Sequence, residues 1–156
     1  MLKMKKRILL AVTIAITAVI FIHSSMDAAA SSEESGFILR LFERFAQLIG
    51  RPGLFTDHII RKLAHFTEFA VFGFFLSWTV REYAGGFKGQ IFKVLFFQLS
   101  VPVTDETIQY FSLGRSAEVK DVLLDFSGAV FGFLVIAALS ALAGKIAAKR
   151  GGKAAK

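Results

Sequence analysis

Long apolar segments dominate the hydropathy pattern of the chain. Four of them, at residues 8–26, 63–80, 91–110 and 122–144, are apolar over most of their length. A helix needs about 20 such residues to cross the hydrocarbon core of a membrane. None of the four alternates between polar and apolar positions, as the strands of a membrane barrel do. The pattern therefore predicts an all-α integral membrane protein, a four-helix bundle in which each segment is one span.

The loop between the first two spans contains a helix pattern of a different kind. At about residues 36–49, apolar side chains recur on one helical face and polar side chains on the other. Ser35 is suited to be the N-cap, and the Arg-Pro-Gly run at residues 51–53 is suited to end the helix. We expect an extra amphipathic helix that either lies in the outer membrane interface or covers the mouth of the bundle.

Basic residues predict the orientation of the spans. With the N-terminus in the cytoplasm, the cytoplasmic segments hold 12 Lys and Arg residues and the outer loops hold 7. Because cytoplasmic loops carry the excess of positive charge, we expect a multi-pass protein with both termini cytoplasmic. The transmembrane domain then covers residues 1–144, and residues 145–156 form a basic tail. We expect this tail to be a disordered anchor of topology and not a specific lipid site.

The first span has a second interpretation. A basic run at residues 3–7 precedes it and alanines at residues 28–30 follow it, which is the arrangement of a signal peptide with its cleavage site. The apolar stretch is at the long end for such a peptide, which favours a retained span. In both interpretations the loop that follows lies on the far side of the membrane.

Composition supports a membrane protein and narrows the chemistry. The 156 residues are 54% hydrophobic, with 18 Phe and a mean hydropathy of +0.59, too apolar for a soluble domain of this size. The net charge of +7 does not indicate a nucleic-acid protein, because the basic residues flank the spans instead of forming a stripe. The chain has no Cys, so it can form neither disulfides nor thiolate metal sites.

Polar side chains are concentrated at the span ends that antiparallel packing brings to the outer face. Ionised groups at membrane depth are costly, by about 2.5 to 3.5 kcal/mol each, so we expect them to face the bundle interior and to mark a site. Arg115, in a short loop between two acid-bearing spans, is suited to bind a carboxylate or phosphate with its planar guanidinium. The candidate pocket residues are Arg61, Lys62, His65, Glu68, Asp105, Glu106, Gln109, Arg115, Asp121 and Asp125.

Two patterns also have simpler structural explanations. His65 and Glu68 are three residues apart, so they could form an intrahelical pair without any role in binding. Gly128 and Gly132 are four residues apart, which is typical of a close helix-packing face. Since only the glycines are expected on that face, Gly128→Leu should disrupt assembly more than Ala129→Leu.

The polar positions resemble those of the VanZ-like family of small bacterial membrane proteins. The resemblance covers nearly the whole chain, and three motifs carry it in order: Arg61-Lys62-x-x-His65-Phe66-x-Glu68-Phe69, then Asp105-Glu106-x-x-Gln109 with Gly114-Arg115-Ser116, then Asp121-Val122-x-x-Asp125-x-x-Gly128-x-x-x-Gly132. Two positions depart from the common pattern. Leu113 stands where members often have Pro, and Asp125 stands where many have Asn, which makes this pocket more acidic.

The resemblance implies a location and a setting. It implies a protein of the bacterial cell membrane, and the name-giving member is associated with resistance to teicoplanin, a glycopeptide that binds cell-wall precursors on the outer face. The partners to expect are membrane lipids, a lipid-linked cell-wall precursor or a glycopeptide, and no nucleic acid. We expect no cofactor and no dedicated metal site.

Three functions remain open at this point. The first is a non-enzymatic protein that binds an anionic envelope ligand through Arg61, Lys62 and Arg115. The second, less favoured, is a membrane enzyme that acts on a lipid-linked cell-wall precursor, with or without the assistance of a metal. Its metal ligands or acid–base groups would come from His65, Glu68, Asp105, Glu106 and Asp125. The third is a structural bundle whose polar residues only fix the helix register.

Overall fold

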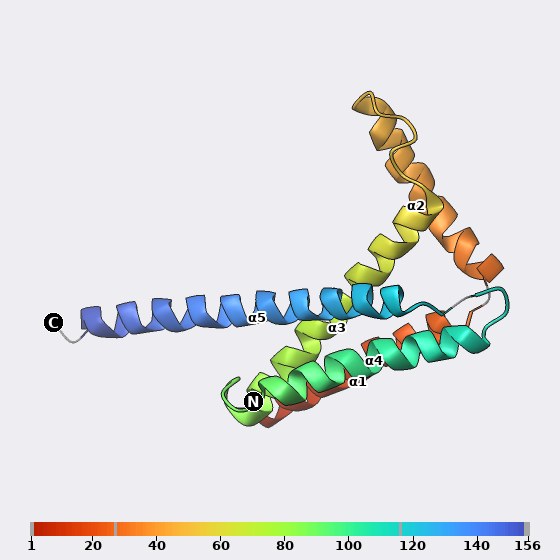
Figure 1. Cartoon of the computed structure of the whole chain (residues 1–156). Helices are drawn as coiled ribbons and strands as arrows, with labels where there is room; N and C mark the ends of the chain where they lie inside the picture. Colours follow the sequence, from red (N-terminus) through yellow and green to blue (C-terminus); the bar gives the residue numbers. More distant parts are fainter. Residues whose placement is uncertain (1, 27, 116, 155–156) are drawn as a thin grey trace.

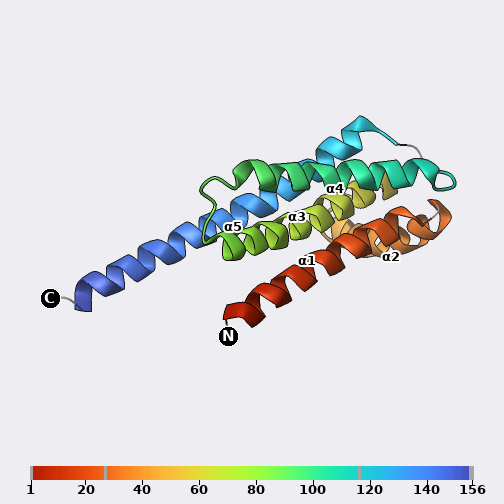
Figure 2. The same cartoon turned by 90° about the horizontal axis from the view of Figure 1, so that it is seen from below.

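The computed structural model describes residues 2–26, 28–115 and 117–154, and within them the chain is helical with no strand. The helices are α1 (Leu2–Ser24), α2 (Ala28–Leu48), α3 (Asp57–Ala84), α4 (Ile91–Phe111) and α5 (Val119–Ala154). Figure 2 shows α1, α3, α4 and α5 side by side, whereas Figure 1 shows α2 rising away from them. The predicted all-α membrane bundle with an extra helix is confirmed.

Three of the four expected spans, α1, α3 and α5, are long and apolar enough to cross a membrane. The fourth, α4, forms as a helix but falls outside that group among the described residues. The reason is its inward face, where Gln98 and Asp105 are buried. Its outward face is apolar, with Phe92, Phe96 and Phe97 exposed. Gln98, Asp105, Glu106 and Gln109 of α4 are therefore buried in the bundle, whereas Lys93, Thr104 and Thr107 are exposed.

Two helices are longer than the sequence pattern predicted. Helix α2 begins at Ala28, so Ser35 lies inside the helix and is not its N-cap. Helix α5 continues to Ala154, and its C-terminal end projects beyond the other helices in both views. The expected disordered tail is thus wrong for residues 145–154. Ala and Lys are strong helix formers and no Pro interrupts this segment, so the helix simply propagates.

The end of α2 is tied to the loop that follows. The Glu43 carboxylate accepts hydrogen bonds from the backbone N–H groups of Gly53 (3.1 Å) and Phe55 (3.0 Å). The ring of Phe55 also packs edge-on against Phe42, with 5.0 Å between centroids. These contacts fold the loop back along α2 and set where α3 begins.

Glycines form the contact between α3 and α5, the most extensive helix pair of the bundle. A Cβ at Gly132 would lie 2.0 Å from the carbonyl oxygen of Ala70, and one at Gly73 would lie 2.0 Å from that of Ala129. A Cβ at Gly128 would lie 2.4 Å from the carbonyl oxygen of Phe66. The two backbones therefore touch, as small residues at a helix interface allow. We name Gly73, Gly128 and Gly132 the glycine seam.

The core differs from the sequence prediction at Ala129. This residue is fully buried, packed with Phe69 and Phe72 and in contact with the glycine seam. The premise that only the glycines lie at this contact is therefore wrong, because a leucine at position 129 would also clash. Of the three residues between Gly128 and Gly132, only Ala129 is buried, because it is the one that lies against α3.

Candidate functional site

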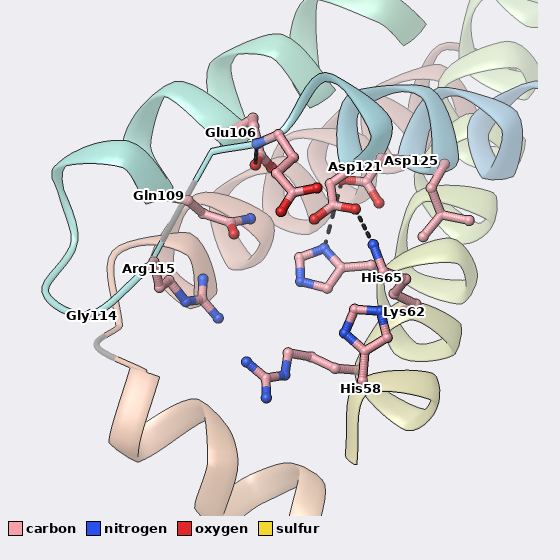
Figure 3. Close-up of a pocket in the computed structure, with 12 residues that line it drawn as sticks. His58, Lys62, His65, Glu106, Gln109, Gly114, Arg115, Asp121 and Asp125 are labelled. Atoms are coloured by element: carbon pink, nitrogen blue, oxygen red, sulfur yellow. Dashed lines mark hydrogen bonds and ion pairs between the residues drawn. The ribbon is translucent and has the colours of Figure 1, made fainter. Parts of the chain in front are cut away.

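A polar cavity of about 230 Å³ opens at the end of the bundle where α1 and α4 end and α3 and α5 begin. Figure 3 shows His58, Lys62 and His65 projecting from α3, Glu106 and Gln109 from α4, and Asp121 and Asp125 from α5. Arg115 comes from the loop after Gly114. The lining is His58, Arg61, Lys62, His65, Glu106, Gln109, Gly114, Arg115, Glu118, Asp121, Leu124 and Asp125. We call it the polar chamber.

A second cavity of about 240 Å³ lies on the other side of the same residues. Its lining is mostly apolar, with contributions from Ile20 on α1, Ile38 on α2 and Ile60 on α3. Arg61, His65 and Arg115 line both cavities. We call the second cavity the apolar chamber. The site therefore consists of a polar and an apolar chamber, and the side chains of Arg61, His65 and Arg115 form the wall that the two chambers share.

Two basic residues of the site are held by carboxylates. Lys62 on α3 forms an ion pair with Asp121 on α5, which Figure 3 marks with a dashed line. Arg61 pairs with Asp57, one helical turn before it on α3. The Lys62 pair fixes the start of α5 against α3, so both helices hold their polar residues at the same level.

In place of the intrahelical pair that the spacing of His65 and Glu68 allows, the structure shows contacts between helices. Glu68 Oε1 lies 3.2 Å from His23 Nδ1 on α1. His65 Nδ1 lies 3.7 Å from Asp125 Oδ2 on α5. Both side chains thus face neighbouring helices, since α1 and α5 pack on α3 at this end. The polar residues of α3 connect three helices instead of closing on their own.

The two adjacent acids of α4 have different surroundings. Asp105 accepts a hydrogen bond from the Ser24 hydroxyl on α1 and another from Gln109 Nε2 at 2.7 Å. Glu106 accepts the backbone N–H of Glu118 at 2.6 Å, which ties α4 to the loop before α5. Asp105 lines the apolar chamber and Glu106 the polar chamber. Consecutive positions on a helix point about 100° apart, which explains the division.

Arg115 lies in the loop between α4 and α5. Gly114 before it has φ of 74°, a conformation that glycine adopts without strain. Ser112 in the same loop donates a hydrogen bond to the Ser24 carbonyl at 2.8 Å, which fixes the loop on α1. Burial lowers the pKa of Arg115, Asp105 opposes this effect, and the positive charge of Arg61 lowers that pKa further. The guanidinium groups of Arg61 and Arg115 therefore repel each other at the wall between the chambers.

The structure brings all ten predicted pocket residues to this end of the bundle, and adds others. His58 and Glu118 also line the polar chamber. His58 could have been found, because it precedes His65 by two helical turns and shares its face. Ser24 is a direct partner of Asp105. The sequence placed it at the correct end of the first span but gave no sign of which acid it would meet.

The comparison with protein families agrees with this arrangement. The VanZ/LLP1 family model matches residues 9–140, which include every helix that contributes to the site. No curated protein and no solved structure matches the chain. The matched segment covers most of the chain and ends within α5, after the last residues of the glycine seam. The chain belongs to the VanZ/LLP1 family.

Proposed function

We propose that the protein binds an anionic, lipid-linked ligand of the cell envelope at the outer leaflet and, through that ligand, contributes to glycopeptide tolerance. The observation that carries this proposal is the pair of chambers on either side of Arg61, His65 and Arg115. A ligand with a charged head and an apolar chain needs one polar and one apolar compartment in contact, and this arrangement supplies both.

The shared wall favours an anionic head group. Burial is the main cause of the lowered pKa of Arg115, and the positive charge of Arg61 lowers it further, so the two guanidinium groups repel each other. An anion between two guanidinium groups removes that repulsion and can accept paired hydrogen bonds from each planar fork. Gln109 on the same cavity adds an amide donor, which suits a phosphate or carboxylate oxygen.

The apolar chamber favours a chain that enters from the membrane. It lies between α1 and α3, with Ile38 of α2 on its wall. The exposed side chains of α2 that continue from there include Leu41, Phe45 and Leu48. A helix with such a face lies in the membrane interface, where it can cover a lipid near its head group.

The proposal places the chambers on the outer side of the membrane. The asymmetry of 12 against 7 basic residues supports cytoplasmic termini. The polar chamber lies at the far end of α1 from the N-terminus, so this orientation opens it to the side where glycopeptides and their lipid-linked targets meet.

Native mass spectrometry of the detergent-purified chain tests the proposal. Wild-type protein should retain an anionic lipid, and Arg115→Lys should lose it because lysine keeps the charge but not the planar fork. Lys120→Gln is the control, since Lys120 is exposed and lines neither chamber. Glu118→Gln would be a poor control because Glu118 lines the polar chamber. Retention of zwitterionic lipid as readily as anionic lipid, or equal retention by wild type and Arg115→Lys, would contradict the proposal.

The cellular form of the test uses teicoplanin tolerance in a strain where deletion of the gene lowers it. Arg115→Lys and Glu106→Gln should lose tolerance while the folded protein stays in the membrane, and Lys120→Gln should keep it. Normal tolerance in all three variants would show that these residues serve only the structure.

A further inference from the structure

Three side chains from three helices meet at the wall between the chambers. His65 on α3, Asp105 on α4 and Asp125 on α5 each offer one ligand atom, and these atoms all lie within 4.8 Å of one another. We propose that His65, Asp105 and Asp125 bind a divalent metal ion of the zinc class. The inference goes beyond anion binding and does not depend on it.

The state of Asp125 is the first argument. Its side chain is completely buried, and neither of its carboxylate oxygens has a hydrogen-bond partner among the described residues. The contact to His65 Nδ1, at 3.7 Å, is too long for a hydrogen bond. Buried carboxylates are normally paired, hydrogen-bonded or bound to a metal. A cation beside Asp125 and His65 would give this carboxylate the partner that the protein side chains do not.

The state of Asp105 is the second argument. It accepts hydrogen bonds from Ser24 and Gln109, and those bonds orient the carboxylate toward His65 and Asp125. Such outer contacts are typical of metal ligands, because they fix the ligand before the ion arrives. An oxygen that accepts one hydrogen bond still has a lone pair for a metal.

The other acids nearby stand outside this group, in which no further His, Asp or Glu of the described residues takes part. Glu106 accepts the backbone N–H of Glu118, Glu68 faces His23, and Asp121 pairs with Lys62. The proposed ligands are also the ones that come from separate helices. A bound ion would therefore join α3, α4 and α5 at one point.

Ligand chemistry and spacing favour zinc over magnesium. Zinc accepts imidazole nitrogen and carboxylate oxygen at about 2.0 to 2.2 Å, whereas magnesium prefers oxygen ligands and water. Tetrahedral coordination at those bond lengths puts ligand atoms about 3.3 Å apart, so the present separations, which extend to 4.8 Å, must close by up to about 1.5 Å. Three protein ligands leave a fourth position open, as in zinc sites that bind water or a ligand oxygen. His65 and Asp125 both line the polar chamber, which gives such a group access.

The test is zinc binding by the full-length purified protein, stripped with a chelator and kept free of added lipid. After incubation with zinc and desalting, metal analysis should find one zinc per chain. Zinc should also raise the Tm more than the same concentration of magnesium does. Asp125→Asn and His65→Gln should each weaken zinc binding at least tenfold, in line with the loss of one ligand. Glu82→Gln, which removes a carboxylate at the opposite end of the bundle, should bind zinc as wild type does.

Several outcomes would overturn the proposal. One is a wild-type protein that retains no zinc, and another is equal stabilisation by magnesium. A third is unchanged zinc affinity in both Asp125→Asn and His65→Gln. If one of the two variants fails to fold, the zinc affinity of the other variant still tests the proposal, because the two residues lie on different helices. Zinc is measured here without lipid, so loss of zinc binding leaves the anionic-lipid proposal standing, and loss of lipid retention leaves the zinc proposal standing.

Discussion

The two ends of the bundle both carry charged residues but use them in different ways. At the end where α1 begins and α3 ends, Lys5 pairs with Glu82 at 2.9 Å and lies 5.5 Å from the centre of the Trp78 ring. The Lys5 side chain is 48% exposed there. At the other end, Asp105 and Asp125 are 1% and 0% exposed. The first end pairs a half-exposed lysine with its acid, and the second end buries two carboxylates completely.

The difference teaches which charges need an explanation beyond stability. Ion pairs with one partner largely in water, such as Lys5 with Glu82, cost little to form and contribute little. Buried carboxylates are costly and persist where surrounding groups, a metal or a ligand compensate them. Glu82 has Lys5, Arg81 and Trp78 as partners, whereas among the described residues Asp125 has the imidazole of His65, at 3.7 Å, as its one ion-pair partner. The binding proposals are therefore confined to the Asp125 end.

The sharpest test of the comparison is whether the two ends lie on opposite sides of the membrane. The chain lacks Cys, so a thiol reagent can label this protein only at a cysteine that is introduced by mutation. Lys120→Cys, at the polar-chamber end, should react fully with a membrane-impermeant thiol reagent in intact cells. Lys88→Cys, in the exposed α3–α4 connection, should react only after the cells are permeabilised. Labelling of both sites in intact cells would refute the proposed orientation.

The next largest effect should come from separating α3 and α5, because both ends are built on α3. Gly132→Leu would place a side chain where even a Cβ lies 2.0 Å from the Ala70 carbonyl oxygen. We expect a loss of about 3 kcal/mol or more in the free energy of unfolding, since overpacking against backbone finds no room to relax. The measurement is the thermal unfolding of the purified variant.

Gly144→Leu is the matched control for that change. Gly144 lies on the same helix, and a Cβ there would meet nothing within 4 Å. Its replacement should be neutral or raise stability by up to about 1 kcal/mol, because glycine is a poor helix former. Similar destabilisation of the two variants would show that the glycine seam does not hold these helices together.

A smaller difference in stability is expected between alanine variants of two adjacent serines at the end of α1. Ser24 is buried and donates to Asp105, whereas Ser25 is exposed and bonds only to the carbonyl of Phe21 on its own helix. Ser24→Ala should lower the free energy of unfolding by about 1 to 3 kcal/mol, because a buried carboxylate loses a donor. Ser25→Ala should change it by less than about 0.5 kcal/mol. Equal melting temperatures for the two variants would contradict the contact.

The smallest effect is expected at the opposite end. Lys5→Ala removes a half-exposed lysine from its ion pair with Glu82 and should cost about 1 kcal/mol, less at high salt. Zinc binding and lipid retention should match the wild type, because Lys5 lines neither chamber. A change in either would mean that the two ends are coupled, and the comparison drawn above would fail.

Much of the architecture could be predicted from the sequence because hydropathy is a strong local signal. The apolar segments all became helices, and the polar residues gathered at one end because short connections force antiparallel neighbours. Helix ends were predicted less well, at Ser35 and in residues 145–154, where propensity continues a helix past the apolar pattern.

Pairing within the site could not be predicted, because it depends on how the helices rotate against each other. Spacing suggested a contact between His65 and Glu68, yet each faces a different helix. The same limit applies to Ala129, whose burial follows from the close approach of α3. Sequence period indicates which residues share a face but not which neighbour that face meets.

The glycine seam also has a mechanical consequence. Where two backbones touch, there is no layer of side chains to slide or repack, so α3 and α5 behave as one rigid unit. His65 and Asp125 belong to that unit, whereas Asp105 belongs to α4, which contacts α3 and α5 less extensively. Movement of α4 relative to α3 and α5 would therefore change the distance from Asp105 to His65 and Asp125. We therefore expect α4 to be the helix that shifts relative to the unit formed by α3 and α5.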